Sequence, residues 1–174
     1  MGLAYLSAER SKDPNTQVGA VIVDDDNRIL SIGYNGFPRG CPDIGPDALP
    51  WAREGSPENR GLDTKYMYIV HAEANSILNK NTTSLKGSRL YVGLFPCNEC
   101  AKLIIQSGIR EVVYQSDKYS DLPNFVASKR LLSLAGVKFR QHVPERESIV
   151  IRFSQDKPPQ IPPQGSLEGG KADM

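Results

Sequence analysis

Three residues of metal-binding types stand at two places in the chain. His71 follows an apolar run, and Cys97 and Cys100 form a C-x-x-C sequence directly after Pro96. Cysteines three positions apart at the start of a helix lie on one face and can bind the same ion. The positive end of the helix favours the thiolate form that zinc requires. We therefore predict that His71, Cys97 and Cys100 bind a zinc ion.

The number of candidate ligands points to catalysis. The remaining histidine, His142, is expected near the end of the last strand, and Cys41 is interpreted as a small buried residue in an irregular loop. Neither is a good fourth ligand. Structural zinc sites normally have four protein ligands, whereas catalytic sites keep one position for water. We expect one catalytic ion per chain.

Glu73 stands two positions after His71. In the first turn of a helix both side chains can point into a pocket beyond the helix end. Zinc lowers the pKa of a bound water from 15.7 to roughly 7, and a neighbouring carboxylate can then transfer its proton. Glu73 is the predicted catalytic acid and base.

Each motif alone has other interpretations. An H-x-E sequence can be part of an ordinary surface, and a C-x-x-C can be half of a zinc ribbon or a redox pair. Redox pairs also follow a strand and begin a helix, so position alone does not exclude them. The two motifs together are much more specific for catalytic zinc.

The elements that must position these residues follow from apolar periodicity. We expect the end of a helix over residues 3–10 and further helices over 71–79, 98–107 and 124–135. Strands are expected over 18–23, 28–34, 89–94, 109–115 and 137–141. The first two strands should form an antiparallel hairpin, and two later strand–helix–strand units imply parallel pairing. The predicted fold is a three-layer α/β/α sandwich with a mixed five-stranded sheet.

Two parts of the chain are less regular. Residues 35–66 are rich in proline and glycine, and a loop of this length is usually functional; Trp51 is expected to hold it in place. Residues 148–153 are expected to add a short edge strand. The catalytic domain is predicted over residues 1–153 and a disordered tail over 154–174.

Composition limits the partners. The chain has 174 residues and a formal net charge of +1, and its basic residues mostly stand beside acidic ones. This pattern disfavours a polynucleotide track, whereas a small substrate with one phosphate needs only a few cations. No apolar run is long enough to span a membrane and no signal-peptide layout is present, so we expect a cytoplasmic protein without a membrane partner.

The sequence resembles the deoxycytidylate (dCMP) deaminases over nearly all of residues 3–153. H-A-E and P-C-x-x-C identify the zinc-dependent cytidine/deoxycytidylate deaminase superfamily. Other segments point to the dCMP branch, and the main ones are Gly33-Tyr34-Asn35-Gly36, Leu62-Asp63-Thr64-Lys65-Tyr66 and Asp117-Lys118-Tyr119. The first helix starts at Met1, later than is usual in this family, so we expect it to bury less apolar surface.

This resemblance implies a cytidine deaminase-like fold and the hydrolysis of dCMP to dUMP and ammonia, which supplies dUMP for thymidylate synthesis. His71, Cys97 and Cys100 would bind Zn²⁺, and Glu73 would transfer protons. The resemblance further implies that Asn35 contacts the sugar of the substrate. The N–H of Ala72 and the carbonyl of Pro96 would contact the O2 and amino edges of cytosine. The family is typically a homo-oligomer, often a hexamer, activated by dCTP and inhibited by dTTP, with Mg²⁺ possible beside an effector.

The phosphate-binding and effector residues are less well defined. Ligands of open α/β sheets collect at the carboxyl ends of strands, which favours Lys118 and Tyr119 over Lys12 for the phosphate. Arg39 and Lys65, in the long irregular segment, are candidates for an effector triphosphate site.

Other functions stay open at this point. A tRNA-adenosine or single-stranded-DNA deaminase uses the same metal site but should show a basic groove. A riboflavin-pathway deaminase usually carries a fused reductase domain. An inactive zinc-binding relative would have no need of Glu73.

Overall fold

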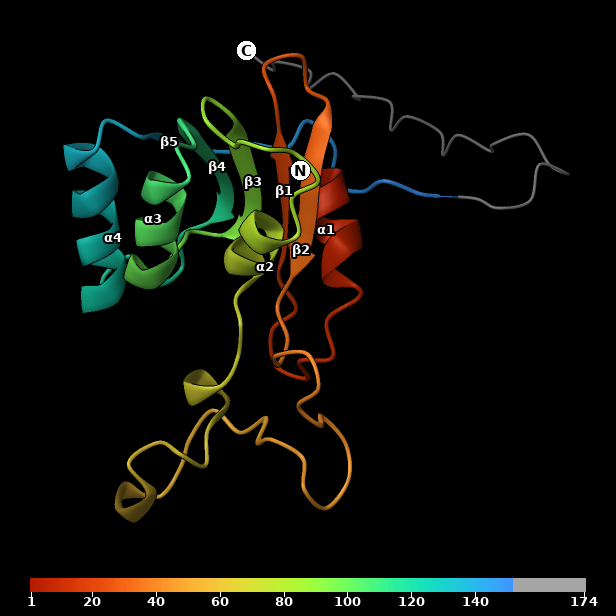
Figure 1. The fold of residues 1–174 in the computed structure, drawn as a ribbon, viewed down its shortest axis with the longest axis vertical. Coiled ribbons are helices and arrows are strands. Elements are labelled where there is room, and N and C mark those ends of the chain that lie inside the picture. The colour runs from red at the N-terminus through yellow and green to blue at the C-terminus, as the bar shows by residue number, and fades with distance from the viewer. Residues whose placement is uncertain (152–174) are drawn as a thin grey trace, which may run out of the picture. The chain divides into compact units, whose positions relative to one another are not determined.

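The computed structural model describes residues 1–151. The chain divides into two units, Met1–Pro144 and Glu145–Met174, and all of the elements below belong to the first (Figure 1). Residues 145–151 form neither helix nor strand, so the edge strand expected over 148–153 is absent from its described part. Residues 152 and 153 and the predicted tail, 154–174, lie outside the described residues.

The helices and strands follow one another much as the apolar pattern predicts. The helices are α1 (Gly2–Ala8), α2 (Ala72–Leu78), α3 (Asn98–Gln106) and α4 (Pro123–Leu134). The strands are β1 (Gly19–Val23), β2 (Ile29–Tyr34), β3 (Arg89–Leu94), β4 (Glu111–Ser116) and β5 (Lys138–Gln141). Gly108 and Gly136 follow α3 and α4 with φ of 75° and 71°, the left-handed conformation that ends helices.

The five strands form one mixed sheet in the order β2-β1-β3-β4-β5. β1 pairs antiparallel with β2 and with β3, whereas β3, β4 and β5 are parallel. The expected hairpin and the two parallel strand–helix–strand units are therefore confirmed. Because β3 and β4 run in the same direction, their carboxyl ends lie side by side at one edge of the sheet.

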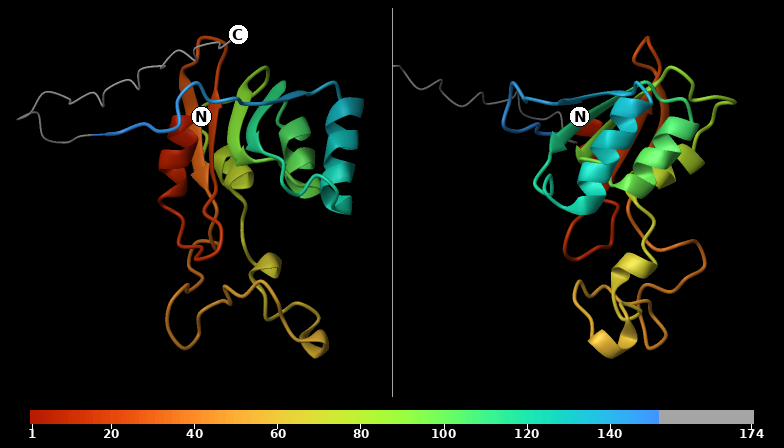
Figure 2. Two further views of the ribbon diagram at one scale, coloured as in Figure 1. Left: turned by 180° about the vertical axis from the view of Figure 1, so that it is seen from behind. Right: turned by 90° about the vertical axis from the view of Figure 1, so that its left-hand side faces the viewer.

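Helices cover both faces of the sheet (Figures 1 and 2). On one face α1 packs on β1, where Ala4, Val21 and Val23 are buried together. A Cβ atom at Gly19 would lie 1.9 Å from the carbonyl oxygen of Ala4, so glycine permits this close approach. The other face carries α2, α3 and α4 over the larger apolar core, which includes Ile22, Leu90, Ile104 and Leu132. The predicted three-layer α/β/α fold is confirmed.

The long irregular segment is an insertion between β2 and α2 that projects from one end of the sheet (Figure 1). An isolated antiparallel bridge between Gly36 and Val70 closes its base. It contains two short 3-10 helices, Pro57–Asn59 and Lys65–Met67. Trp51 packs on Phe37 at 4.1 Å between ring centroids and donates to the carbonyl oxygen of Asp43 at 3.2 Å, contacts in keeping with the expected role of holding the loop.

None of the helices in the described part of the chain is long and apolar enough to cross a membrane.

Candidate active site

The three predicted metal ligands converge on one point. Nδ1 of His71 lies 3.5 Å from Sγ of Cys97 and 3.4 Å from Sγ of Cys100. Zinc–nitrogen bonds of about 2.0–2.1 Å and zinc–sulfur bonds of about 2.3 Å, at tetrahedral angles, would place nitrogen and sulfur about 3.5 Å apart. The donor set and its spacing therefore fit a zinc ion. No fourth His, Cys, Asp or Glu joins this group among the described residues.

Two helix starts position the group. His71 is the N-cap residue of α2, and Cys97 is the N-cap residue of α3. An N-cap side chain normally accepts a hydrogen bond from the first turn, but neither residue makes that bond. Their side chains are therefore available for a metal. Cys100 lies one turn into α3 and is buried.

Glu73, the second residue of α2, is only 5% exposed and lies beside this group. Burial raises the pKa of Glu73 above its ordinary value of 4.5, because a carboxylate loses its hydration there. A carboxyl group with a raised pKa accepts a proton more readily than an exposed one, as a group that both takes up and releases protons must.

Without a metal, the protonation states of the three ligands depend on their contacts with one another. The pKa of Cys97 is lowered to about 4, first by hydrogen bonding with Cys100 and further by His71. The pKa of His71 is raised to about 9, chiefly by its hydrogen bond with Cys97. The pKa of Cys100 is raised well above 9.0 by Cys97 and by burial. Without a metal the pair therefore holds one thiolate, on Cys97, which is stabilised by its hydrogen bond with the Cys100 thiol.

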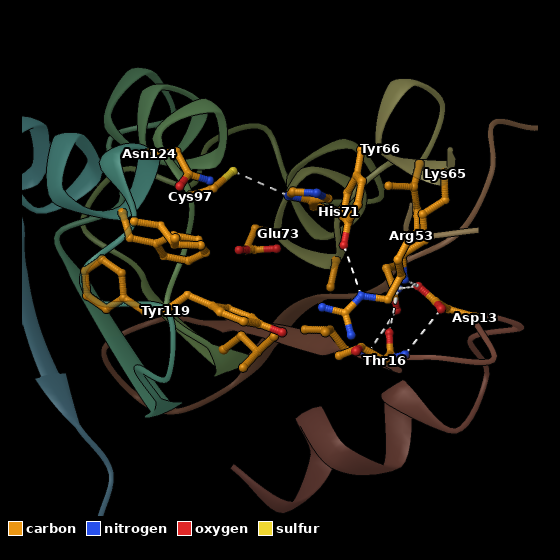
Figure 3. Close-up of a pocket in the computed structure, with 18 residues that line it drawn as sticks. Asp13, Thr16, Arg53, Lys65, Tyr66, His71, Glu73, Cys97, Tyr119 and Asn124 are labelled. Carbon is orange, nitrogen blue, oxygen red and sulfur yellow. Dashed lines mark hydrogen bonds and ion pairs between the residues drawn. The ribbon is translucent and has the colours of Figure 1, made fainter. Parts of the chain in front are cut away.

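A cavity of about 310 Å³ lies in front of Glu73 and of the metal group, which consists of His71, Cys97 and Cys100 (Figure 3). This volume is at the lower end of the range for small-molecule sites. It lies where β3 and β4 end, as expected for a ligand site in an α/β sheet. Its walls include aromatic and apolar side chains suited to a flat base: Ile69, Leu94, Phe95, Tyr119, Leu122 and Phe125.

Asn35 lines the same cavity and is almost fully engaged by the protein. Its Oδ1 accepts the N–H of Val18 at 2.8 Å. Its Nδ2 donates to the carbonyl oxygen of Thr16 at 3.0 Å and to Asp13 at 3.2 Å. Both amide hydrogens are used, so the remaining capacity of Asn35 is a lone pair on Oδ1.

Asp13 also pairs with Lys65. Nζ of Lys65 lies 2.5 Å from Oδ2 of Asp13, and the two side chains are 6% and 1% exposed. A buried carboxylate requires a partner of this kind. The structure therefore places Lys65 inside the active-site cavity, where its ammonium neutralises Asp13, and not on a separate surface free for an effector.

Other residues singled out from the sequence lie around this cavity in different ways. Ala72 lines it, and Pro96 lies buried between two lining residues. Tyr119 lines it, whereas Lys118 is exposed and lies over the Tyr119 ring at 5.0 Å.

Lys12, Arg39 and Cys41 do not line the cavity. Lys12 is exposed and pairs with Asp43 at 2.6 Å. Arg39 is exposed and donates to Asn79 at 3.4 Å. Cys41 is exposed as well, so its interpretation as a buried residue was wrong: the insertion that carries it projects from one end of the sheet (Figure 1).

Sequence reasoning missed Arg53 and Tyr66, which line the cavity from the insertion. Nε of Arg53 donates to Oη of Tyr66 at 3.3 Å. Arg53 stands directly before Glu54 in the sequence, and neighbouring opposite charges are typical of an ordinary solvated surface. Tyr66 ends the Leu62–Tyr66 segment that carries the family resemblance, which was a signal for it. For Arg53 the folding of the insertion back over the cavity leaves no local pattern.

A histidine and a glutamate at one helix start, with two cysteines at a second, are the arrangement of zinc-dependent nucleobase deaminases. Comparison with known proteins agrees. The family model described as the cytidine and deoxycytidylate deaminase zinc-binding region matches residues 1–116. The chain belongs to the cytidine and deoxycytidylate deaminase family and is a deaminase.

Individual relatives support the same placement. A probable deoxycytidylate deaminase of Drosophila melanogaster is 57% identical over 169 residues, covering 96% of this chain and 81% of that protein. The deoxycytidylate deaminase of Homo sapiens is 58% identical over 153 residues, covering 88% and 83%. The predicted resemblance to deoxycytidylate deaminases is confirmed.

The fold also has a solved counterpart. A crystal structure of dCMP deaminase from the cyanophage S-TIM5, in complex with dCMP and dUMP, covers 81% of this chain and 92% of that one. Its TM-score is 0.62 at 24% identity, which establishes the common fold.

Proposed function

We propose that this protein hydrolyses dCMP to dUMP and ammonia at the cavity formed by His71, Glu73, Cys97 and Cys100. The observation that carries the proposal is the buried Glu73 beside three ligands with zinc spacing. The relatives named as deoxycytidylate deaminases support the choice of substrate. A zinc ion held by His71, Cys97 and Cys100 would act as a Lewis acid and lower the pKa of a water molecule to about 7.

Glu73 would move the protons of the reaction. It takes a proton from the attacking water and delivers it to N3 of the cytosine ring as the bond from oxygen to C4 forms. In a second transfer Glu73 moves the proton of the new C4 hydroxyl to the amino group. The C4–N bond then breaks as the C4–O bond becomes a carbonyl, and ammonia leaves. The raised pKa of Glu73 suits this double role, because the group must both accept and donate.

The helix start would hold the base. The first N–H groups of a helix have no partner within the helix, so the N–H of Ala72, the first residue of α2, can donate to O2 of cytosine. The carbonyl of Pro96 would accept from the amino group. Phe95 would pack on the ring, and its edge-on contact with Tyr114 at 4.8 Å keeps it in place.

Asn35 would contact the sugar through its remaining lone pair. Since both amide hydrogens are used within the protein, Asn35 would accept a hydrogen bond from a sugar hydroxyl and would not donate one. This assignment makes Asn35 a fixed acceptor whose position depends on Asp13.

The finer properties implied by the family resemblance stay predictions. They are activation by dCTP, inhibition by dTTP, Mg²⁺ beside an effector, assembly into a homo-oligomer such as a hexamer, supply of dUMP for thymidylate synthesis and a cytoplasmic location. Initial rates with each effector, with and without Mg²⁺, and the mass of the assembly in solution would test the regulatory ones.

The substrate is tested by incubating purified protein with dCMP, CMP, deoxycytidine, AMP and a tRNA and measuring ammonia. We expect dCMP to react most efficiently, at least tenfold better than deoxycytidine, which corresponds to about 1.4 kcal/mol of transition-state binding. Equal rates on dCMP and deoxycytidine would assign a nucleoside deaminase. Reaction with the tRNA alone would assign a polynucleotide deaminase.

A further inference from the structure

The phosphate of a nucleotide requires a cation that the protein does not already use. Among the described residues that line the cavity, the basic ones are Arg53, Lys65 and His71. Lys65 neutralises the buried Asp13, and His71 belongs to the metal group. Arg53 forms no ion pair within the described part of the chain, and its sequence neighbour Glu54 is not within pairing distance.

The side chain of Arg53 also reaches the cavity that would hold the substrate. Figure 3 shows its side chain entering the cavity from the insertion, with Tyr119 on the opposite side and Glu73 between them in this view. Glu73 is buried and Arg53 is exposed, so a base bound against Glu73 would leave the remainder of a nucleotide on the solvent side of the cavity, with Arg53.

The backbone around Arg53 is held by specific bonds. The carbonyl of Trp51 accepts Nδ2 of Asn15 at 3.1 Å, and the carbonyl of Ala52 accepts the N–H of Lys65 at 2.9 Å. The side chain of Lys65 is fixed in turn by Asp13. Arg53 is therefore connected to the wall of the cavity through its neighbours, although it belongs to an irregular loop.

The side chain is oriented as well. Nε of Arg53 donates to Oη of Tyr66, which leaves the two terminal nitrogens of the guanidinium for a ligand. These nitrogens form a planar fork that matches two phosphate oxygens. Prior orientation reduces the entropy that is lost when such a contact forms.

We propose that Arg53 binds the 5′-phosphate of the substrate and sets the preference for a nucleotide over a nucleoside. This inference rests on the proposed function, because it assigns a residue of the same cavity to the phosphate. It assigns the phosphate to the insertion and not to Lys118 or Lys12, neither of which lines the cavity.

The test is Arg53→Gln, with kcat/KM measured on dCMP and on deoxycytidine. Hydrogen bonds to charged groups contribute about 1.5–3 kcal/mol, so the ratio of the two values should fall on the order of tenfold to a hundredfold, with the loss on dCMP. Arg53→Lys should retain part of the ratio, because it keeps the charge and loses the fork. Arg60→Gln is the matched control, an exposed arginine of the same insertion outside the cavity, and should keep the ratio.

Two results would overturn the proposal. An equal loss on both substrates would give Arg53 a purely structural role. Unchanged values of kcat/KM on both substrates would place the phosphate elsewhere, and Lys118→Gln or Lys12→Gln would then show whether either lysine holds it. Zinc content and melting temperature of each variant separate loss of fold from loss of contact.

A binding measurement distinguishes this inference from the proposed function. If the wild-type protein does not deaminate dCMP, the proposed function fails, and the affinities for dUMP and deoxyuridine still test Arg53. Tighter binding of dUMP that disappears in Arg53→Gln supports the phosphate site. Equal binding of the two, or no binding of either, contradicts it.

Discussion

The metal group and the insertion contribute to one cavity in opposite ways. His71, Glu73, Cys97 and Cys100 are held by the first turns of two helices that lie on the sheet. Arg53 and its neighbours belong to a loop that is fixed to the cavity by a few hydrogen bonds and by one buried ion pair. The chemistry is thus placed on regular elements and the contacts proposed for the rest of the nucleotide on an irregular one.

This difference has a physical reason. Catalytic groups must be held within a fraction of an ångström, which packed helices and strands provide. A loop can change its length and residues without disturbing the core, so it suits the recognition of a particular substrate. We therefore expect changes at the helix starts to affect turnover and changes in the insertion to affect selectivity and stability.

The largest expected effect is at Glu73. Glu73→Gln removes the proton-transfer group and keeps its shape, so kcat should fall by about 10²–10⁴-fold, roughly 3–5 kcal/mol of barrier, while zinc stays bound. Glu99→Gln is the matched control, since Glu99 is the second residue of α3 as Glu73 is of α2, and it faces Lys102 at the surface. Near-normal turnover of Glu73→Gln would exclude the proposed proton transfer.

The second effect concerns the ion pair that fixes the insertion. Lys65→Met leaves Asp13 buried without a cation, which typically costs about 3–5 kcal/mol of folding free energy. Lys12→Met breaks an exposed pair with Asp43 and should cost no more than about 1 kcal/mol. Denaturant unfolding of both variants checks this, and equal losses would show that the buried pair does not hold the insertion.

The sequence predicted one of these regions far better than the other. Strand Arg89–Leu94 and the two helix starts follow from local apolar patterns and turn residues, and the metal motifs are local too. The pairing of Asp13 with Lys65 joins positions 52 residues apart, and no short pattern encodes it. The exposure of Cys41 and the place of Arg53 depend on the same long-range folding of the insertion.

A third prediction tests the close packing of α2 on β2. A Cβ atom at Gly33 would lie 2.3 Å from the backbone nitrogen of Ser76 and 2.4 Å from the carbonyl oxygen of Ala72. Gly33→Ala must therefore push α2 away from β2. We expect a loss of about 1–3 kcal/mol in stability and weaker zinc retention against a chelator.

Gly36→Ala is the control for that substitution. A Cβ atom there would meet nothing within 4 Å, so stability and zinc retention should be close to wild type. If Gly33→Ala behaved in the same way, the position of α2 would not depend on its contact with β2.

The smallest expected effect is the dependence of stability on pH through Glu73. Burial raises the folded-state pKa of Glu73 above 4.5. Well below pH 4.5 the group is protonated in both states and contributes no difference. As the pH rises toward the folded-state pKa, the unfolded chain ionises first, so stability is lost until both states are ionised.

Glu73→Gln should remove this penalty. Its melting temperature should exceed that of wild type at pH 8, and the gap should narrow toward pH 4.5. In a chain of this size about 1 kcal/mol corresponds to 2–4 °C, so scanning calorimetry of the two proteins at matched zinc content can detect it. A gap that does not change with pH would show that burial of the charge is not its cause.

The most direct test of the proposed catalytic site is X-ray absorption spectroscopy at the zinc edge of the purified protein. We predict one zinc per chain with two sulfur neighbours at about 2.3 Å, one imidazole nitrogen at about 2.0–2.1 Å and one further light atom that Cys41→Ser and His142→Gln leave unchanged. A third sulfur, a second imidazole, or a protein without zinc would contradict an open site formed by His71, Cys97 and Cys100.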